Sequence, residues 1–191
     1  MTPPHLREEL AKLQTGLTNW NEAIALLVGS WPGQVNIADF KGQTPLMLVA
    51  DAGDETLASA FIAAGADVNA QDYMGRTALH AAVTSRSEQC VTAILASHPD
   101  VRKATISDKQ TVLHTAVRMG QPAILRMVLL RDPGLEFMEN AYGQTPLALV
   151  EDILADFSKF QTEMARHHRR IGTQNDFEVI GAILKSDETI H

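Results

Sequence analysis

A repeat of 33 or 34 residues is the feature that most constrains how this chain can fold. The segments GQTPLM, GRTALH, KQTVLH and GQTPLA each carry a threonine at the same place, namely Thr44, Thr77, Thr111 and Thr145. A second apolar block follows the first three segments, at 57–70, 90–101 and 124–135. A unit this short cannot bury its apolar side chains alone, so we expect the units to be stabilised by stacking on one another.

Each unit contains the signals that start and end a helix. The repeated threonine is a helix N-cap, whose hydroxyl oxygen accepts a hydrogen bond from a first-turn N–H. Pro45 and Pro146 follow it at the first helical position, where a missing N–H costs nothing. Gly53 and Gly120 are placed to end this helix with a positive φ angle. Apolar residues at helical spacing then predict a second helix, so each unit is expected to be a helix pair.

These residues make the chain resemble ankyrin-repeat proteins. Residues 39–69 follow the family pattern D-x-x-G-x-T-P-L-H-x-A-A-x-x-G, a helix and G-A-D-V-N almost without gaps. Later units depart from it, because Arg86 stands where glycine is usual and Ile106 and Lys109 replace the aspartate and glycine of the third loop. The resemblance implies an all-α ankyrin-repeat solenoid, in which stacked helix pairs carry short β-hairpin fingers.

The repeats predict a single domain, 1–191, made of about four full units and a degenerate N-terminal cap. The cap is residues 1–38, where Trp20 and Trp31 are expected to pack the cap onto the next unit. The full repeats are expected at 39–71, 72–105 and 106–139, and the C-terminal repeat at 140–191.

The C-terminal repeat is longer than the others. Thr145 lies 38 residues before Ile183, whereas Thr77 lies 17 residues before Ile94, so 21 residues have been inserted. The insert is expected at about 151–174, ahead of a final helix at 176–186.

Apolar residues continue at helical spacing through this insert, at Phe157, Phe160 and Met164. We therefore expect the first helix of the C-terminal repeat to run on to about residue 167. One interpretation is that the final helix folds back and covers part of the apolar stripe. The other is that the three apolar residues contact a partner or a second copy of the chain, which makes a homo-oligomer through the 146–167 helix a hypothesis.

Composition excludes several classes of ligand and location. The formal net charge is −7 and no segment forms a cationic groove, so nucleic acid is not an expected ligand. No apolar run is long enough for a membrane-spanning helix, and the N-terminus lacks the apolar region of a secretory signal. Cys90 is the lone cysteine and fits a reducing compartment, so we expect a cytoplasmic protein.

Enzyme motifs are absent from the sequence, which contains no GxGxxG, phosphate-loop, HExxH or nucleophile-elbow pattern. We therefore expect no catalytic residue, metal or cofactor. His80 and His114 occupy the family's histidine position, where the resemblance implies structural hydrogen bonds rather than a metal pair. His167, His168, Arg169 and Arg170 are interpreted as a solvated helix end, with an anion or acidic-partner contact as the alternative.

The resemblance implies that binding uses the finger tips and the exposed face of the first helices. The candidate residues at those positions are Phe40, Lys41, Tyr73, Met74, Arg76, Asp108, Arg118, Met119 and Tyr142. Both tyrosines of the chain fall on fingers, and aromatic residues, methionine and arginine dominate interface energetics. The alternative is that a large finger side chain merely packs against the next finger.

These candidates predict a protein–protein interaction module that docks a folded protein or a peptide on its concave face. A second hypothesis is a stand-alone inhibitor or immunity-type protein that blocks an enzyme or toxin. An enzyme whose site is built by residues 151–176 is the third and least favoured.

Overall fold

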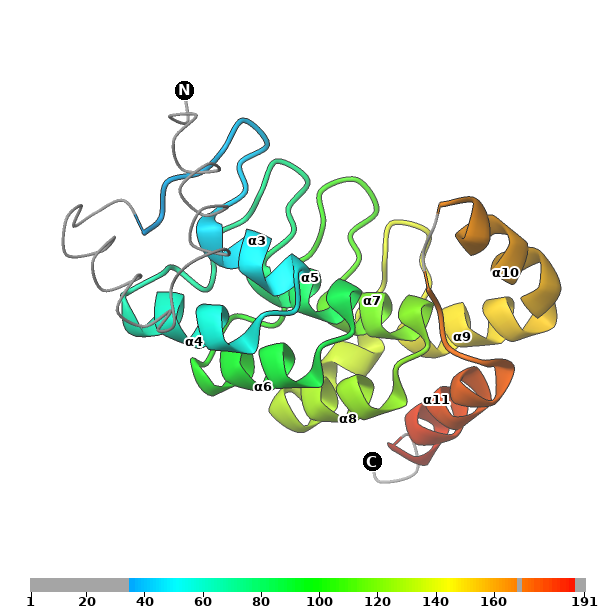
Figure 1. Cartoon of the computed structure of the whole chain (residues 1–191). Coiled ribbons are helices and arrows are strands. Elements are labelled where there is room, and N and C mark those ends of the chain that lie inside the picture. Colours follow the sequence, from blue (N-terminus) through cyan, green and yellow to red (C-terminus); the bar gives the residue numbers. More distant parts are fainter. Residues whose placement is uncertain (1–34, 168–169, 188–191) are drawn as a thin grey trace. The chain divides into compact units, whose positions relative to one another are not determined.

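The computed structural model describes residues 35–167 and 170–187, whose regular structure is entirely helical (Figure 1). The fold class is therefore all-α, as the repeat predicts. The helices gather into two compact units, one ending at Pro99 and the other beginning at Asp100. Residues 1–34 lie outside the described ranges, with most of the expected cap and both tryptophans. The expected single domain and its repeat boundaries stay a prediction.

The first unit contains two helix pairs. The first pair is α3 (Pro45–Asp51) and α4 (Glu55–Ala63), and the second is α5 (Ala78–Ser85) and α6 (Glu88–Ala96). Helix α3 packs against α4 and α5, and α6 packs against α4 and α5. Small residues such as Ala50 and Ala82 are fully buried between the helices, which lets the backbones approach closely.

The second unit contains α7 (Val112–Met119), α8 (Pro122–Arg131), the 3₁₀ helix η1 (Pro133–Phe137) and α9 (Pro146–Ala155). Two further helices follow, α10 (Phe157–Arg166) and α11 (Gln174–Asp187). Helix α7 packs against α8 and α9, and α11 packs against α8 and α9. The final helix expected from the sequence is thus present, two residues longer at its start.

The repeated threonines cap their helices as predicted. The Thr44 and Thr145 hydroxyls accept from the N–H groups three residues later, at 3.4 Å and 3.3 Å. Thr77 and Thr111 form capping boxes, in which the histidine three residues on accepts the backbone N–H of the threonine through Nδ1. His80 and His114 therefore have the structural role that the resemblance implied.

The expectation of one helix running to about residue 167 is wrong. Helix α9 ends at Ala155, and Asp156 has the non-helical angles φ −141° and ψ 63°. The Asp156 carboxylate accepts from the Lys159 N–H at 3.1 Å and so caps a new helix, α10. An aspartate bonds the backbone locally in this way, which favours a helix start over a helix interior.

The apolar stripe beyond α9 is covered within the chain. The Phe177 ring of α11 lies edge-on to Phe157 and Phe160 of α10, with ring centroids 5.6 Å and 5.7 Å apart. Phe177 and Met164 are buried. The interpretation that the final helix folds back is confirmed, and the stripe on which the homo-oligomer hypothesis depends is largely occupied.

Candidate functional site

The candidate site lies on four loops, here called fingers, that precede α3, α5, α7 and α9. Their residues are 39–43, 72–76, 105–110 and 140–144, and each loop is closed by a backbone hydrogen bond between its first and last residue. Figure 1 shows the first two fingers side by side at one end of the first unit's helix pairs. The β-hairpin character expected of the fingers is not confirmed, because residues 35–167 and 170–187 contain no strand, although an isolated antiparallel bridge joins Ala104 to Thr111 beside the third finger.

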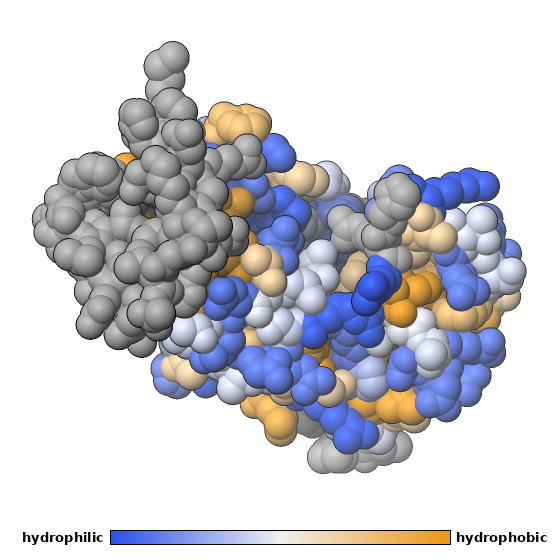
Figure 2. All heavy atoms as spheres, viewed as in Figure 1, coloured by the Kyte–Doolittle hydropathy of each residue, from blue (hydrophilic) through white to orange (hydrophobic). Residues whose placement is uncertain are grey.

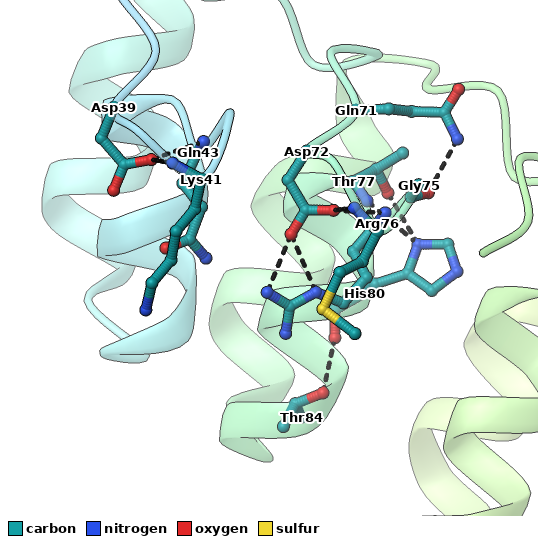
Figure 3. A network of polar contacts seen from close by, with 11 residues as sticks. Asp39, Lys41, Gln43, Gln71, Asp72, Gly75, Arg76, Thr77, His80 and Thr84 are labelled. Atoms are coloured by element: carbon teal, nitrogen blue, oxygen red, sulfur yellow. Dashed lines mark hydrogen bonds and ion pairs between the residues drawn. The ribbon is translucent and has the colours of Figure 1, made fainter. Parts of the chain in front are cut away.

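A polar side chain at the start of the finger holds its backbone in place. The Asp39 carboxylate accepts from the N–H groups of Lys41 and Gln43 at 2.8 Å and 2.9 Å. Asp72 accepts from the N–H groups of Met74 and Arg76, each at 2.9 Å (Figure 3). These bonds fix the direction in which the finger-tip side chains point.

The fourth finger uses Asn140 in the same way, accepting from Tyr142 and Gln144 at 2.9 Å and 3.1 Å. The third finger has Ile106 at this position, so Thr105 takes over and accepts the Gln110 N–H at 2.8 Å. The departure seen in the sequence therefore produces a finger that is one residue wider.

The two fingers of the first unit are joined to each other. The Tyr73 N–H donates to the Lys41 carbonyl oxygen at 3.1 Å. The Tyr73 ring also lies against Gly42, since a Cβ added at Gly42 would be 2.8 Å from Cδ1 of the ring. The alternative that a finger side chain packs against the next finger is thus partly true of Tyr73.

Large apolar side chains nevertheless remain exposed on these fingers. Phe40 and Tyr73 each keep 73% of their surface accessible, and Met74 keeps 57%. Lys41 is exposed, with its Nζ 5.6 Å from the centroid of the Phe40 ring. The tips of the first unit therefore present two aromatic rings, a thioether and an ammonium group to solvent.

Arg76 is held by the finger instead of pointing freely into solvent. Its Nε and a terminal nitrogen bond the same Asp72 oxygen, at 2.9 Å and 2.8 Å (Figure 3). The Arg76 side chain is 35% exposed and that of Asp72 only 2%. Arg76 thus neutralises a buried carboxylate while one edge of its guanidinium group stays accessible.

The second unit presents fewer of the expected residues. Tyr142 is exposed on the fourth finger, whereas Arg118 on α7 is half-buried. The Asp108 carboxylate accepts from the hydroxyls of Thr105 and Ser107, and its carbonyl oxygen accepts the Ala141 N–H at 2.8 Å. Asp108 therefore joins the third and fourth fingers as Lys41 joins the first two.

Met119 is the candidate that the structure contradicts. Only 3% of its surface is accessible, so it is part of the core and not of an exposed helix face. The chain returning from α10 to α11 covers the end of α7, where the Gly172 N–H donates to the Met119 carbonyl oxygen at 2.9 Å. The repeat pattern gave no sign of this cover, because it comes from the inserted segment.

Three exposed apolar residues were missed by the sequence reasoning. Ile106 lies on the third finger, and Leu130 and Phe137 lie on α8 and η1. The replacement of aspartate by Ile106 was visible in the sequence, whereas Leu130 and Phe137 follow no finger position. On the face seen in Figure 2, hydrophobic residues form separate groups among hydrophilic ones.

The described residues contain no cluster of three or more side chains able to hold a metal ion. They also include no helix long and apolar enough to cross a membrane. Cys90 is buried, and this burial raises the pKa of its thiol, against the hydrogen bond from Ser87. His167 is exposed, and His168 and Arg169 lie outside the described ranges.

The family of ankyrin repeats matches residues 17–105 in three copies. Residues 17–105 therefore consist of ankyrin repeats. The match begins inside the expected N-terminal cap and ends at the boundary expected for the second full repeat. Ankyrin repeats are protein–protein interaction modules, and the family is typically not enzymatic. No curated protein is similar enough in sequence to be counted as a relative.

Proposed function

We propose that this ankyrin-repeat protein binds another protein through the finger tips of its first unit, with Phe40, Tyr73 and Met74 as the central contacts. The observation that carries the proposal is the exposure of all three side chains on backbone that is fixed by hydrogen bonds. A rigid aromatic side chain buries about 150–250 Å² on contact at a small entropy cost, which makes such residues effective interface anchors.

Two cationic side chains lie beside these three residues and support an electrostatic contribution to partner binding. Lys41 is exposed and can form a contact with a partner carboxylate, while Arg76 offers the accessible edge of its guanidinium group. Charges at the rim of an interface affect association rate more than final affinity. Lys41 is therefore assigned to partner capture and the aromatic residues to affinity.

Two finger residues of the second unit and Arg118 of α7 are proposed as a further set of contacts. Tyr142 is exposed there, and Asp108 and Arg118 are accessible in part. Binding is proposed to occur without catalysis. The lone buried Cys90 supports a reducing compartment such as the cytoplasm as its place.

The test compares wild type with the double variant Phe40→Ala/Tyr73→Ala as bait in a native lysate. Arg76→Ala is unsuited, because it would leave the Asp72 carboxylate buried without its cation. A protein retained by wild type is then purified, and its Kd is measured against both chains. We expect the double variant to weaken binding about tenfold or more.

Leu130→Ala is the matched control, because it removes an exposed apolar side chain that lies on α8 instead of a finger. Thermal midpoints of all three chains should agree within a few degrees, since exposed substitutions change stability little. Equal losses of affinity in the finger variant and in Leu130→Ala would refute the finger surface.

A further inference from the structure

One position near the C-terminal end of the first helix in each pair differs in burial between the two units. This position lies eight residues after the N-cap threonine and is occupied by Ala52, Ser85, Met119 and Ile153. In the first unit Ala52 is exposed and Ser85 half-buried, whereas in the second unit Met119 and Ile153 are both buried. The second unit thus has apolar, covered side chains where the first unit has small, accessible ones.

The cover over Met119 is the return segment, residues 170–173, which connects the α10 region to α11. Figure 1 shows this segment (orange) passing beside α7 and α9. The Gly172 N–H donates to the carbonyl oxygen of Met119 at 2.9 Å. The return segment therefore continues the hydrogen bonding of α7 beyond its last turn.

Two glycines allow this close crossing. A Cβ at Gly172 would lie 2.9 Å from the Gly120 Cα, and one at Gly120 would lie 2.8 Å from both the Gly172 Cα and Cε2 of Phe177. Backbone thus lies directly on backbone, which only residues without side chains permit. Behind the crossing, α11 packs against α8 and α9 and holds the segment from its other end.

We propose that the return segment is an internal occupant of the C-terminal end of α7, so that Met119 and this end of the helix are closed to a partner. The inference rests on the proposed function, in which the first-helix surface belongs to the binding face. It removes the end of α7 at Met119 from that face. In the second unit the most exposed candidate is then Tyr142 on the fourth finger.

Methionine oxidation tests this cover without any partner. Hydrogen peroxide oxidises accessible methionines, and peptide mass spectrometry reports each site separately. Met74, which is 57% exposed, serves as the internal standard for Met119, which is 3% exposed. In the wild-type protein we expect Met119 to react about tenfold or more slowly than Met74, because its oxidation requires local opening.

Two glycine variants distinguish loss of the contact between Gly172 and Gly120 from the effect of any buried glycine-to-alanine change in the second unit. Gly172→Ala places a Cβ against the backbone of Gly120, whereas at Gly181, also buried, the nearest atom would be 3.7 Å away on Val150. We expect Gly172→Ala to speed Met119 oxidation about tenfold and Gly181→Ala to leave it unchanged. Circular dichroism confirms that both variants retain their helices.

A second measurement covers the case in which Gly172→Ala does not fold. In the wild-type protein the Gly172 amide should exchange its hydrogen slowly although it lies outside any helix. Fast exchange of that amide, or oxidation of wild-type Met119 at the rate of Met74, would overturn the inference. So would unchanged Met119 protection in a folded Gly172→Ala variant. None of these outcomes bears on whether the first unit's fingers bind a partner.

Discussion

The Asp72 carboxylate makes three hydrogen bonds and one ion-pair contact, and Arg76 supplies two of the bonds and the ion pair. One oxygen accepts the N–H groups of Met74 and Arg76, and the other accepts two nitrogens of the Arg76 guanidinium group. The carboxylate is almost fully buried, so its charge is tolerable only because these donors replace the water it has lost. Asp72 and Arg76 thereby also stabilise the finger that carries Tyr73 and Met74.

Arg76→Ala should therefore destabilise the protein although it truncates a partly exposed side chain. The variant leaves a buried carboxylate with only its backbone donors, which costs about 1–3 kcal/mol. Urea unfolding measures the loss, with Lys41→Ala as the control, since Lys41 is an exposed finger cation. The control should lose no more than about 0.5 kcal/mol. Equal losses for the two variants would contradict the structural role of Arg76.

Asp72→Asn should be tolerated better than Asp72→Ala, because the chain already uses an amide at the corresponding place. Asn140 accepts two backbone N–H groups through its side-chain oxygen in the fourth finger. An asparagine at 72 keeps that pair of bonds, and an alanine leaves both donors without their partner. We expect the alanine variant to be less stable by about 1–2 kcal/mol than the asparagine variant in the same urea assay.

His114 should make stability depend on pH. Burial lowers the pKa of its imidazole, opposed by the hydrogen bond to the Gln144 carbonyl oxygen and by the charge of Asp108. Nδ1 accepts the Thr111 N–H, so the single proton lies on Nε2, which donates to Gln144 at 3.1 Å. The folded protein thus holds a neutral ring that the unfolded chain protonates more easily.

The stabilisation is fully present above about pH 6.5, the ordinary histidine pKa, and is lost as the pH falls toward the lowered pKa of the folded state. His114→Gln should cost about 1–3 kcal/mol at pH 7.5 through its lost hydrogen bonds. Because glutamine does not titrate, the stability gap to wild type should narrow at pH 5.5. Urea unfolding at the two pH values measures this difference in unfolding free energy. A difference that stays constant or grows at pH 5.5 would refute a neutral, buried His114 as the source of the pH dependence.

In the described part of the chain, three residues other than glycine occupy left-handed backbone that glycine would adopt more easily, namely Arg86, His98 and Lys109. Arg86 ends α5 with φ 65°, and Lys109 lies in the third finger with φ 50°. Left-handed backbone costs an L-residue about 1–2 kcal/mol, and a glycine avoids this cost. A glycine also loses more conformational entropy on folding, which offsets about 0.5–1 kcal/mol of the gain. Arg86→Gly and Lys109→Gly should each raise the free energy of unfolding by about 0.5–1 kcal/mol.

Ala64→Gly is the control for these glycine variants. Ala64 ends α4 with φ −79°, which alanine adopts without strain. Glycine at that position should instead lower stability by about 0.5–1 kcal/mol. A gain at Ala64 as large as those at Arg86 and Lys109 would show that left-handed strain is not the cause.

Much of the fold could be predicted from the sequence, because each repeat carries the residues that begin and cap its first helix. The threonine caps, the prolines after Thr44 and Thr145 and the histidine bonds depend on residues within one turn of each other, so their spacing determines their contacts. Finger exposure of Phe40 and Tyr73 followed from their place in the repeat. These features are local, and each unit repeats them.

Long-range contacts made by the insert were not predictable in the same way. Helical spacing from Leu147 to Met164 indicated one helix, because a single capping aspartate at 156 interrupts no apolar pattern. Burial of Met119 depends on Gly172, which lies 53 residues later and follows no repeat position.

Phe177 should be the most costly single aromatic residue to remove from the described part of the second unit. It is fully buried in α11 and packs edge-on against Phe157 and Phe160, so its loss opens a cavity and releases α10. We expect Phe177→Ala to cost about 3–5 kcal/mol in urea unfolding, and Phe177→Leu less than about half of that. Phe137→Ala, which removes a ring that is more than half exposed, should cost no more than about 1 kcal/mol. Amide hydrogen exchange in α10 should become faster only in the Phe177 variants. The packing of α10 on α11 would be contradicted by an equally large loss of unfolding free energy in Phe137→Ala, or by α10 amides that exchange at the wild-type rate in Phe177→Ala.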